Sequence, residues 1–202
     1  FRRAAEEARH LRGEYREGTT RGHEGWEAVI KPEPVGVVLA ITPYNYPLST
    51  SALHVAPALA AGNAIIHKPA SHTPVSSAIL SEVIANIGLP DGAYNLVAGR
   101  GTEVGDTLAG DDRINAVAMT GSAAAGRHVA RESGMVDIHM ELGGNAPAII
   151  FRDADLDTAA AACAKGALKY AGQRCSAISR VLAHEDVHDA VVDRTDAAMD
   201  DW

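Results

Sequence analysis

The chain has 202 residues, of which 47% are hydrophobic, and its formal net charge is -8. That length allows one full domain, or one domain and part of another, with a buried core. The acidic balance disfavours nucleic acid and anionic membranes as partners, because both repel a negative surface. Carboxylates gathered near the C-terminus (Asp193, Asp196, Asp200 and Asp201) fit either an ordinary acidic enzyme or adaptation to high salt.

Two cysteines, Cys163 and Cys175, are too few for a disulfide framework, so we expect a reduced, cytoplasmic setting. No apolar run has the length of a membrane span, and the charged N-terminus is not typical of a signal peptide. The chain begins with Phe1 rather than Met, and we expect it to come from the middle of a longer one.

The N-terminal residues precede the predicted core. Residues 1–15 are predicted to form a charged amphipathic helix with few apolar anchors. Residues 16–34 are rich in glycine, threonine and charge, which fits an exposed arm or a hairpin strand. The core pattern begins at Val35.

From Val35 onward, short apolar runs alternate with helical stretches. We expect strands over residues 35–41, 64–67, 93–97, 116–119, 138–141 and 148–151. The helices between them are expected over residues 53–61, 74–87, 102–108 and 123–132. This alternation predicts an α/β fold, with a Rossmann-like, mainly parallel sheet and flanking helices. Such sheets bind ligands at the carboxyl ends of their strands, where Asn45, Lys68, Thr120-Gly121-Ser122 and Glu141 fall.

The C-terminal part predicts the beginning of a second α/β domain. Residues 153–171 are alanine-rich and read as a helix, with Asp153 or Asp155 as its N-cap and Gly172 as its stop. A loop with Cys175 follows, then a strand beginning at residues 181–183 and a helix over 189–199. Cys163 lies among alanines in the first of these helices and is expected to pack in the core.

Three residues have the chemistry needed for covalent catalysis at a carbonyl, which requires a nucleophile, a base and an oxyanion donor. Cys175 follows a glycine turn, and Arg174 beside it favours the thiolate. Glu141 ends an apolar strand before two glycines, a suitable position for a general base. Asn45 can present its side-chain amide to the same centre, or it can simply fix a turn between two prolines.

A second set of residues suits a nucleotide. Lys68 can meet ribose hydroxyls or a phosphate, or can remain solvated. Thr120-Gly121-Ser122 opens a helix whose backbone N–H groups can face a pyrophosphate, although the Gly-x-Gly-x-x-Gly fingerprint is missing. Gly101 and Gly105 permit close backbone approach, as they do in a plain turn. His54, His67, His72 and His139 lack the spacing of metal ligands, so we predict no metal site.

The ordered motifs resemble the aldehyde dehydrogenase superfamily, and the resemblance covers nearly the whole chain. The motifs are residues 42–47, 56–63, 68–69, 120–122, 141–144 and 172–175. Residues 99–106 and 172–177 look most like non-phosphorylating glyceraldehyde-3-phosphate dehydrogenases and lactaldehyde dehydrogenases.

The resemblance implies a thioester mechanism. Cys175 would attack the aldehyde, while the Asn45 amide and the Cys175 N–H hold the oxyanion. Loss of hydride to a nicotinamide would leave a thioester, and Glu141 would activate the water that hydrolyses it to a carboxylic acid. In some relatives an arginine before the nucleophile meets the substrate phosphate, and Arg174 matches that position.

The resemblance also implies NADP or NAD as cofactor, with the adenosine ribose near Lys68 and Ser71. Relatives that prefer NAD often carry glutamate where this chain has Ser71, so serine makes NADP acceptable. The other cofactor residues implied are Ile41, Thr42, Pro43, Gly101, Gly105, Met119, Thr120, Gly121, Ser122 and Leu142.

By the same resemblance, residues 16–34 are part of an oligomerisation arm, 35–143 a dinucleotide-binding domain and 144–202 the start of a catalytic domain. Full-length relatives continue well past the nucleophile, so the chain resembles an internal fragment of a homo-oligomeric parent that takes a small aldehyde. Two other classes stay open. One is a cysteine acyltransferase or hydrolase without nicotinamide, and the other is a non-catalytic dinucleotide-binding module.

Overall fold

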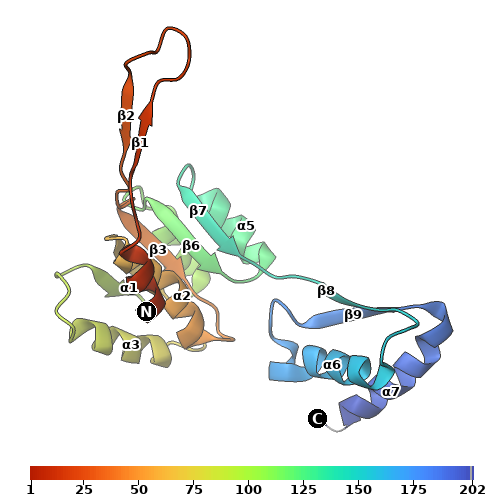
Figure 1. Ribbon diagram of the computed structural model, residues 1–202. Coiled ribbons are helices and arrows are strands. Elements are labelled where there is room, and N and C mark those ends of the chain that lie inside the picture. Colours follow the sequence, from red (N-terminus) through yellow and green to blue (C-terminus); the bar gives the residue numbers. More distant parts are fainter. Residues whose placement is uncertain (201) are drawn as a thin grey trace. The chain divides into compact units, whose positions relative to one another are not determined.

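The computed structural model describes residues 1–200 and 202, so Asp201, one of the acidic residues near the C-terminus, lies outside the described residues. The chain forms two compact units, Phe1–Glu141 and Leu142–Trp202 (Figure 1). Within the described residues, no helix combines the length and the apolar character needed to cross a membrane.

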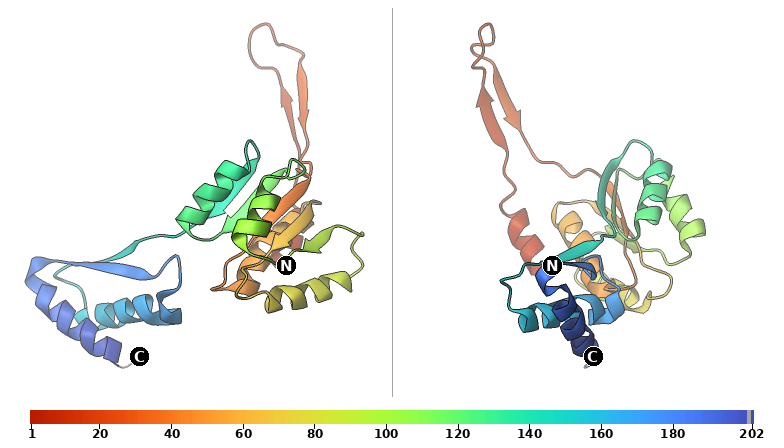
Figure 2. Two further views of the ribbon diagram at one scale, coloured as in Figure 1. Left: turned by 180° about the vertical axis from the view of Figure 1, so that it is seen from behind. Right: turned by 90° about the vertical axis from the view of Figure 1, so that its right-hand side faces the viewer.

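A short helix and a long hairpin open the first unit. Helix α1 spans Arg2–Ala8, and strand β1 (Glu14–Glu17) pairs antiparallel with β2 (Glu27–Ile30). The hairpin projects away from the sheet of its unit, and both strands are exposed along their length (Figures 1 and 2). The predicted helix over residues 1–15 is therefore wrong beyond Ala8. Helix α1 buries no residue, so packing does not favour a longer helix. Gly13 is a poor helix former, and it lies so close to Ile30 that a Cβ would be 2.3 Å from the Ile30 carbonyl oxygen.

The centre of the first unit is a parallel sheet, which confirms the predicted fold class. Within residues 1–141 it has five strands in the order β5-β4-β3-β6-β7. The strands are β3 (Val37–Ile41), β4 (Ala64–Lys68), β5 (Tyr94–Leu96), β6 (Ala116–Thr120) and β7 (Asp137–Glu141). The apolar runs of β3, β4 and β6 suit a sheet that is covered on both faces, whereas the edge strand β7 is mostly exposed.

Helices cover both faces of this sheet. Val38 and Ile65 pack with Val55 of α2 (Pro47–Ala60) and Leu80 of α3 (Val75–Ala85). On the opposite face, residues that include Leu39 and Val117 pack with α4 (Asp106–Ala109) and α5 (Ala123–Glu132). Neighbouring residues Val38 and Leu39 thus serve different cores, because successive side chains of a strand point to opposite faces.

Two helices of this unit differ from their predicted bounds. Helix α2 begins at Pro47 rather than at Leu53, because proline is well suited to the first turn of a helix, where its missing N–H is no loss. The predicted helix over residues 102–108 starts instead as a wide π-turn, Gly101–Gly105, before α4. A wider turn of this kind often occurs at functional sites.

The second unit is smaller. Strand β8 (Ala146–Ile150) pairs parallel with β9 (Ile178–Ala183), and Ile150, Cys163 and Val191 form its buried core. Helix α6 (Leu156–Leu168) leads into the turn η2 (Lys169–Gly172), and η3 (Glu185–Val187) leads into α7 (His188–Asp200). Asp155 is the N-cap of α6, as one of the two predicted alternatives, and its carboxylate accepts from the N–H groups of Asp157 and Thr158. Cys163 is buried as predicted, and burial raises the pKa of its thiol.

Candidate active site

The carboxyl ends of the sheet strands bring most of the predicted site residues of the first unit together. Ile41, Lys68, Thr120 and Glu141 are the last residues of β3, β4, β6 and β7. The strand order reverses between β3 and β6, because β4 and β5 continue to one side of β3 while β6 and β7 lie on the other. Parallel sheets bind ligands at such a switch point.

Backbone hydrogen bonds tie the loops at this edge to one another. The N–H of Thr42 donates to the Lys68 carbonyl oxygen at 3.1 Å. The N–H of Gly121 donates to the Glu141 carbonyl oxygen, also at 3.1 Å. The turn predicted to face the cofactor is therefore attached directly to the strand that carries the predicted base.

Lys68 places a cation at this edge. Its side chain is 4% exposed, its Nζ donates to the Pro69 carbonyl oxygen at 3.0 Å, and burial lowers its pKa. A Cβ at Gly105 would lie only 3.5 Å from Lys68 Cε, so the π-turn approaches the lysine closely. Ser71, predicted to lie near the ribose, donates its hydroxyl to the Gly99 carbonyl oxygen at 3.3 Å.

The turn at residues 120–122 leads into α5. Ser122 caps this helix, since its Oγ accepts from the Ala125 N–H at 3.2 Å. Met119 is 4% exposed and belongs to the core, and a Cβ at Gly121 would lie 2.8 Å from its Cε. The helix N-terminus, the buried Lys68 and the open space around Gly101 fit a phosphate-bearing cofactor.

Thr42 belongs to a buried network that sequence reasoning missed. The ring of His67 is fully buried, with Nε2 3.0 Å from Thr42 Oγ1 and 3.1 Å from Ser51 Oγ, and Nδ1 2.7 Å from the Tyr94 hydroxyl. The Ser51 hydroxyl donates to the Pro47 carbonyl oxygen at 2.5 Å, so its oxygen serves His67 as an acceptor. The signal available in the sequence was a histidine inside an apolar strand, directly before Lys68.

We expect this network to make stability depend on pH. Burial is the main cause that lowers the pKa of His67 from 6.5 to about 4. Between these values the unfolded chain binds a proton that the folded chain does not, so the free energy of unfolding falls by about 3 kcal/mol as the pH drops from 6.5 to 4. Urea unfolding at several pH values should show this slope, and His67→Gln should flatten it. Equal slopes for both proteins would contradict the assignment.

The three predicted catalytic residues are divided between the units. Asn45 and Glu141 belong to the first unit and Cys175 to the second. Asn45 is half-buried in the connection between β3 and α2, two positions before the first residue of that helix. The side chain of Glu141 is 66% exposed at the end of β7.

Cys175 is an exposed free thiol in the loop between η2 and β9. Its loop follows a left-handed turn in which Tyr170 has φ 60°, Ala171 φ 52° and Gly172 φ 68°. Two non-glycine residues in this conformation are strained by about 1–3 kcal/mol each. Strain of this kind persists where surrounding bonds hold it, and it often accompanies functional sites.

Arg174 supplies bonds of that kind. Its guanidinium donates to the carbonyl oxygens of Gly166 at 2.5 Å and Lys169 at 3.2 Å, at the C-terminal end of α6. A contact with substrate phosphate, expected from the resemblance, stays a prediction.

Leu142, the remaining predicted cofactor residue, is half-buried at the start of the second unit.

Gly144, the second glycine after Glu141, lies against the cysteine loop. A Cβ at Gly144 would come within 2.9 Å of the Cys175 carbonyl oxygen, so only glycine fits here without movement. Next to it, the Ser179 hydroxyl donates to Asn145 Oδ1, which joins the starts of β8 and β9. The second glycine of the motif therefore has a structural reason in the second unit.

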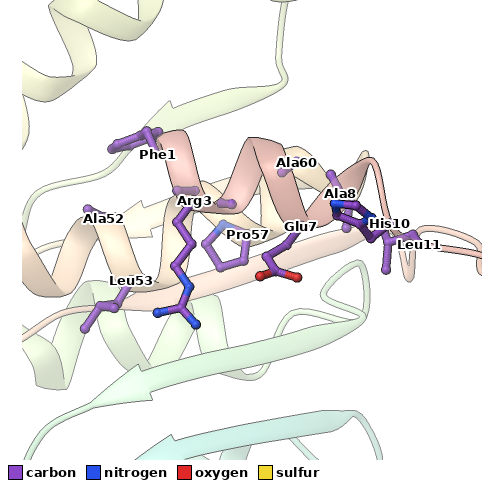
Figure 3. A pocket seen from close by; sticks show the side chains of 13 residues that line it. Phe1, Arg3, Glu7, Ala8, His10, Leu11, Ala52, Leu53, Pro57 and Ala60 are labelled. Atoms are coloured by element: carbon purple, nitrogen blue, oxygen red, sulfur yellow. The ribbon is translucent and has the colours of Figure 1, made fainter.

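A hollow of about 640 Å³ lies elsewhere in the first unit, between α1 and α2 (Figure 3). Figure 3 shows Arg3 and Glu7 extending from α1 on the same side as Leu53 and Pro57 of α2. Its lining, taken over the described residues, is mostly apolar and includes none of the predicted site residues. The described residues also hold no cluster of side chains that suits a metal ion.

Comparison with known proteins points to one family. A model of the aldehyde dehydrogenase family matches residues 1–202. NADP-dependent glyceraldehyde-3-phosphate dehydrogenase of Streptococcus equinus is 41% identical over 198 residues, which cover 97% of this chain and 42% of that protein. Lactaldehyde dehydrogenase of Methanocaldococcus jannaschii is 41% identical over 165 residues, or 80% of this chain and 36% of that protein.

A solved structure has a similar fold over nearly the whole of this chain. NADP-dependent glyceraldehyde-3-phosphate dehydrogenase from Bacillus halodurans C-125, complexed with NADP, superposes with a TM-score of 0.95 at 38% identity. The match covers 99% of this chain and 42% of that one. The chain thus spans well under half the length of these relatives.

Proposed function

Since the chain belongs to the aldehyde dehydrogenase family, we propose that the protein oxidises an aldehyde to a carboxylic acid with NADP or NAD. One observation carries the proposal. The run from Glu141 to Gly144 contacts the cofactor turn through Gly121 in the first unit and the cysteine loop through Gly144 in the second. The proposed base thus lies beside the cofactor turn within the first unit, and Gly144 lies beside the loop of the proposed nucleophile within the second.

The proposed reaction begins at Cys175. Its thiolate forms a bond to the aldehyde carbon, while the Asn45 side-chain amide and the Cys175 N–H donate to the oxygen that becomes negative. A nicotinamide, when bound, accepts the hydride from this carbon. The resulting thioester is hydrolysed by a water that gives its proton to Glu141, and the carboxylic acid leaves as the thiolate is restored.

Binding of the cofactor falls to the sheet edge. The buried Lys68 would hold the ribose or its phosphate, and the α5 N-terminus with Thr120, Gly121 and Ser122 would face the pyrophosphate. Ile41, Thr42 and Pro43 would contribute to the cofactor site at the carboxyl end of β3, with Gly101, Gly105 and Met119 from the same unit. Leu142, at the start of the second unit, stays a predicted cofactor residue.

Ser71→Glu is expected to shift the preference from NADP towards NAD. A carboxylate there would repel a 2′-phosphate and accept from ribose hydroxyls, and we expect KM for NADP to rise at least about tenfold, or 1.4 kcal/mol. Ser71→Ala is the matched control, since it removes the hydroxyl without adding charge. Parallel titrations with both cofactors measure the effect, and an unchanged ratio of kcat/KM values would contradict it.

For the substrate we propose glyceraldehyde 3-phosphate or lactaldehyde. The two relatives described above act on compounds of these names. Arg174 would meet the phosphate of the former, and its bonds to two carbonyl oxygens do not exhaust the five N–H donors of a guanidinium.

The β1–β2 hairpin would serve as the subunit contact. Trp26 and Val29 expose 68% and 66% of their surface, respectively, on a ribbon that projects from the first unit. An isolated ribbon of two strands has little stability in water, so pairing with another subunit would protect it.

The test is the absorbance of reduced nicotinamide, with glyceraldehyde 3-phosphate, lactaldehyde and simple aldehydes, each supplied with NADP or NAD. We expect reduction with one of these pairs. Hydrolysis of a thioester without any cofactor reduction would favour a cysteine acyltransferase or hydrolase instead. Cofactor binding without either reaction would favour a non-catalytic binding module.

A further inference from the structure

Two histidines lie beside Glu141 and take no part in the reaction described above. His139 is two positions before Glu141 on β7, so both side chains point to the same face of the sheet. Its Nε2 lies 3.8 Å from Glu141 Oε1. The ring of His54, on α2, meets the ring of His139 edge to face with centroids 6.0 Å apart. The three side chains form one series from the helix to the end of the strand.

The two ends of this series have different environments. His54 is 5% exposed, with Nε2 2.7 Å from Thr120 Oγ1. The side chains of His139 and Glu141 are 68% and 66% exposed. Burial lowers the pKa of His54, a charge on His139 lowers it further, and Glu141 opposes both effects. His54 is therefore neutral at neutral pH.

Other charged and polar groups lie on the strands that neighbour this series. Strand β4 carries the cation of Lys68 and the fully buried His67. Charges on His54 and Lys68 both lower the pKa of His67. On β7, Asp137 shares the face of His139 and Glu141 at the start of the strand. On β6 the neighbour is the uncharged hydroxyl of Thr120. A proton is thus disfavoured on the buried His54, and the carboxylates of the series lie on β7.

We propose that His139 carries to solvent the proton that Glu141 takes from the hydrolytic water, and that the buried His54 keeps this proton at the exposed end of the series. The inference rests on the proposed function, because it assumes that Glu141 is the base. His139 acts only through Glu141 and touches neither substrate nor cofactor in this scheme.

The transfer balances without a further reactant. As the water oxygen bonds to the thioester carbon, one O–H bond breaks and the proton forms a bond to the Glu141 carboxylate. The carboxylic acid then passes it to Nε2 of His139, 3.8 Å away, which requires only a small side-chain movement of two exposed groups. The imidazolium releases a proton to bulk water, and Glu141 returns to its charged form for the next turnover.

Chemical rescue tests the relay. In dilute buffer, His139→Ala should lower steady-state turnover by roughly tenfold, less than the loss of a group that itself takes the proton from water, while the first turnover forms reduced nicotinamide at the wild-type rate. Added imidazole should restore turnover to within about twofold, because it can accept the proton from Glu141. His139→Gln should behave in the same way. His188→Ala, which removes an exposed histidine from the start of α7, should have no effect.

A second measurement needs neither substrate nor cofactor. In NMR titrations of the histidine rings, the pKa of His54 should rise in His139→Ala and fall in Glu141→Gln. These shifts, with turnover that imidazole does not restore, would overturn the relay and leave only a structural contact. Absence of the shifts would overturn the coupling itself. If the shifts appear but Glu141→Gln leaves acid release unchanged, the proposed function has failed at its base, and the relay fails with it.

Discussion

Replacement of Cys175 by alanine is expected to abolish aldehyde oxidation, with a loss in kcat of roughly four orders of magnitude or more. The reason is chemical, because alanine offers no atom that can form the thioester on which both halves of the reaction depend. Cys175 is an exposed free thiol, so its removal should leave the packing of the second unit intact. Cofactor reduction in the presence of aldehyde measures the first effect, and calorimetric binding of NADP checks that the groove survives.

The matched control is Cys163→Ala. Cys163 is 3% exposed in the core of the second unit, so this change should cost about 1 kcal/mol of stability and leave turnover close to that of the wild type. Oxidation that persists in Cys175→Ala would show that the nucleophile lies elsewhere. Loss of activity in the Cys163 variant alone would reverse the roles of the two thiols.

Glu141→Gln should slow the release of acid by about a hundredfold or more while formation of the thioester is affected much less. Glutamine keeps the size of the side chain but accepts no proton from water, so the acyl-enzyme should accumulate. Rapid mixing with excess aldehyde would then show a full burst of reduced nicotinamide followed by a much slower steady state. The same experiment on the wild type should show little or no burst.

Asp137→Asn provides the comparison, since Asp137 lies on the same face of β7 at the opposite end of the strand. It removes one negative charge from the face without touching the proposed base, and turnover should stay within about twofold of wild type, as is usual for surface changes. Equal turnover in Glu141→Gln and wild type would refute the role of Glu141 as the base. A burst that is lost in Glu141→Gln would instead assign this residue to the activation of Cys175.

The local sequence pattern explains why the parallel sheet could be predicted and why the bounds of helix α1 could not. The strands β3, β4 and β6 are largely apolar runs separated by stretches of helical length, and that alternation is typical of crossover units. Residues 1–15 offered charge and weak periodicity, which a short helix and a strand satisfy equally well. Pairing of β1 with β2, a contact with residues farther along the chain, decides between them.

The candidate active site also has a part that the sequence predicts and a part that it does not. Asn45, Lys68, Thr120 and Glu141 were predictable as a group because each follows a strand, and the carboxyl ends of parallel strands share one edge. The partners of these residues were not predictable. Arg174, expected near a substrate phosphate, donates to carbonyl oxygens at the end of α6, and His54 reaches Thr120 from a helix far earlier in the chain.

By itself the sequence determined the fold class, the family resemblance and the residue types available for thioester chemistry, because all of these depend on short motifs and on the period of apolar residues. Only the tertiary structure decided the order β5-β4-β3-β6-β7, the buried network around His67, the close approach of Gly144 to Cys175, and the series from His54 to Glu141. Periodicity encodes which face of an element is buried. It does not encode which element will cover that face, since this depends on packing between residues distant in the chain.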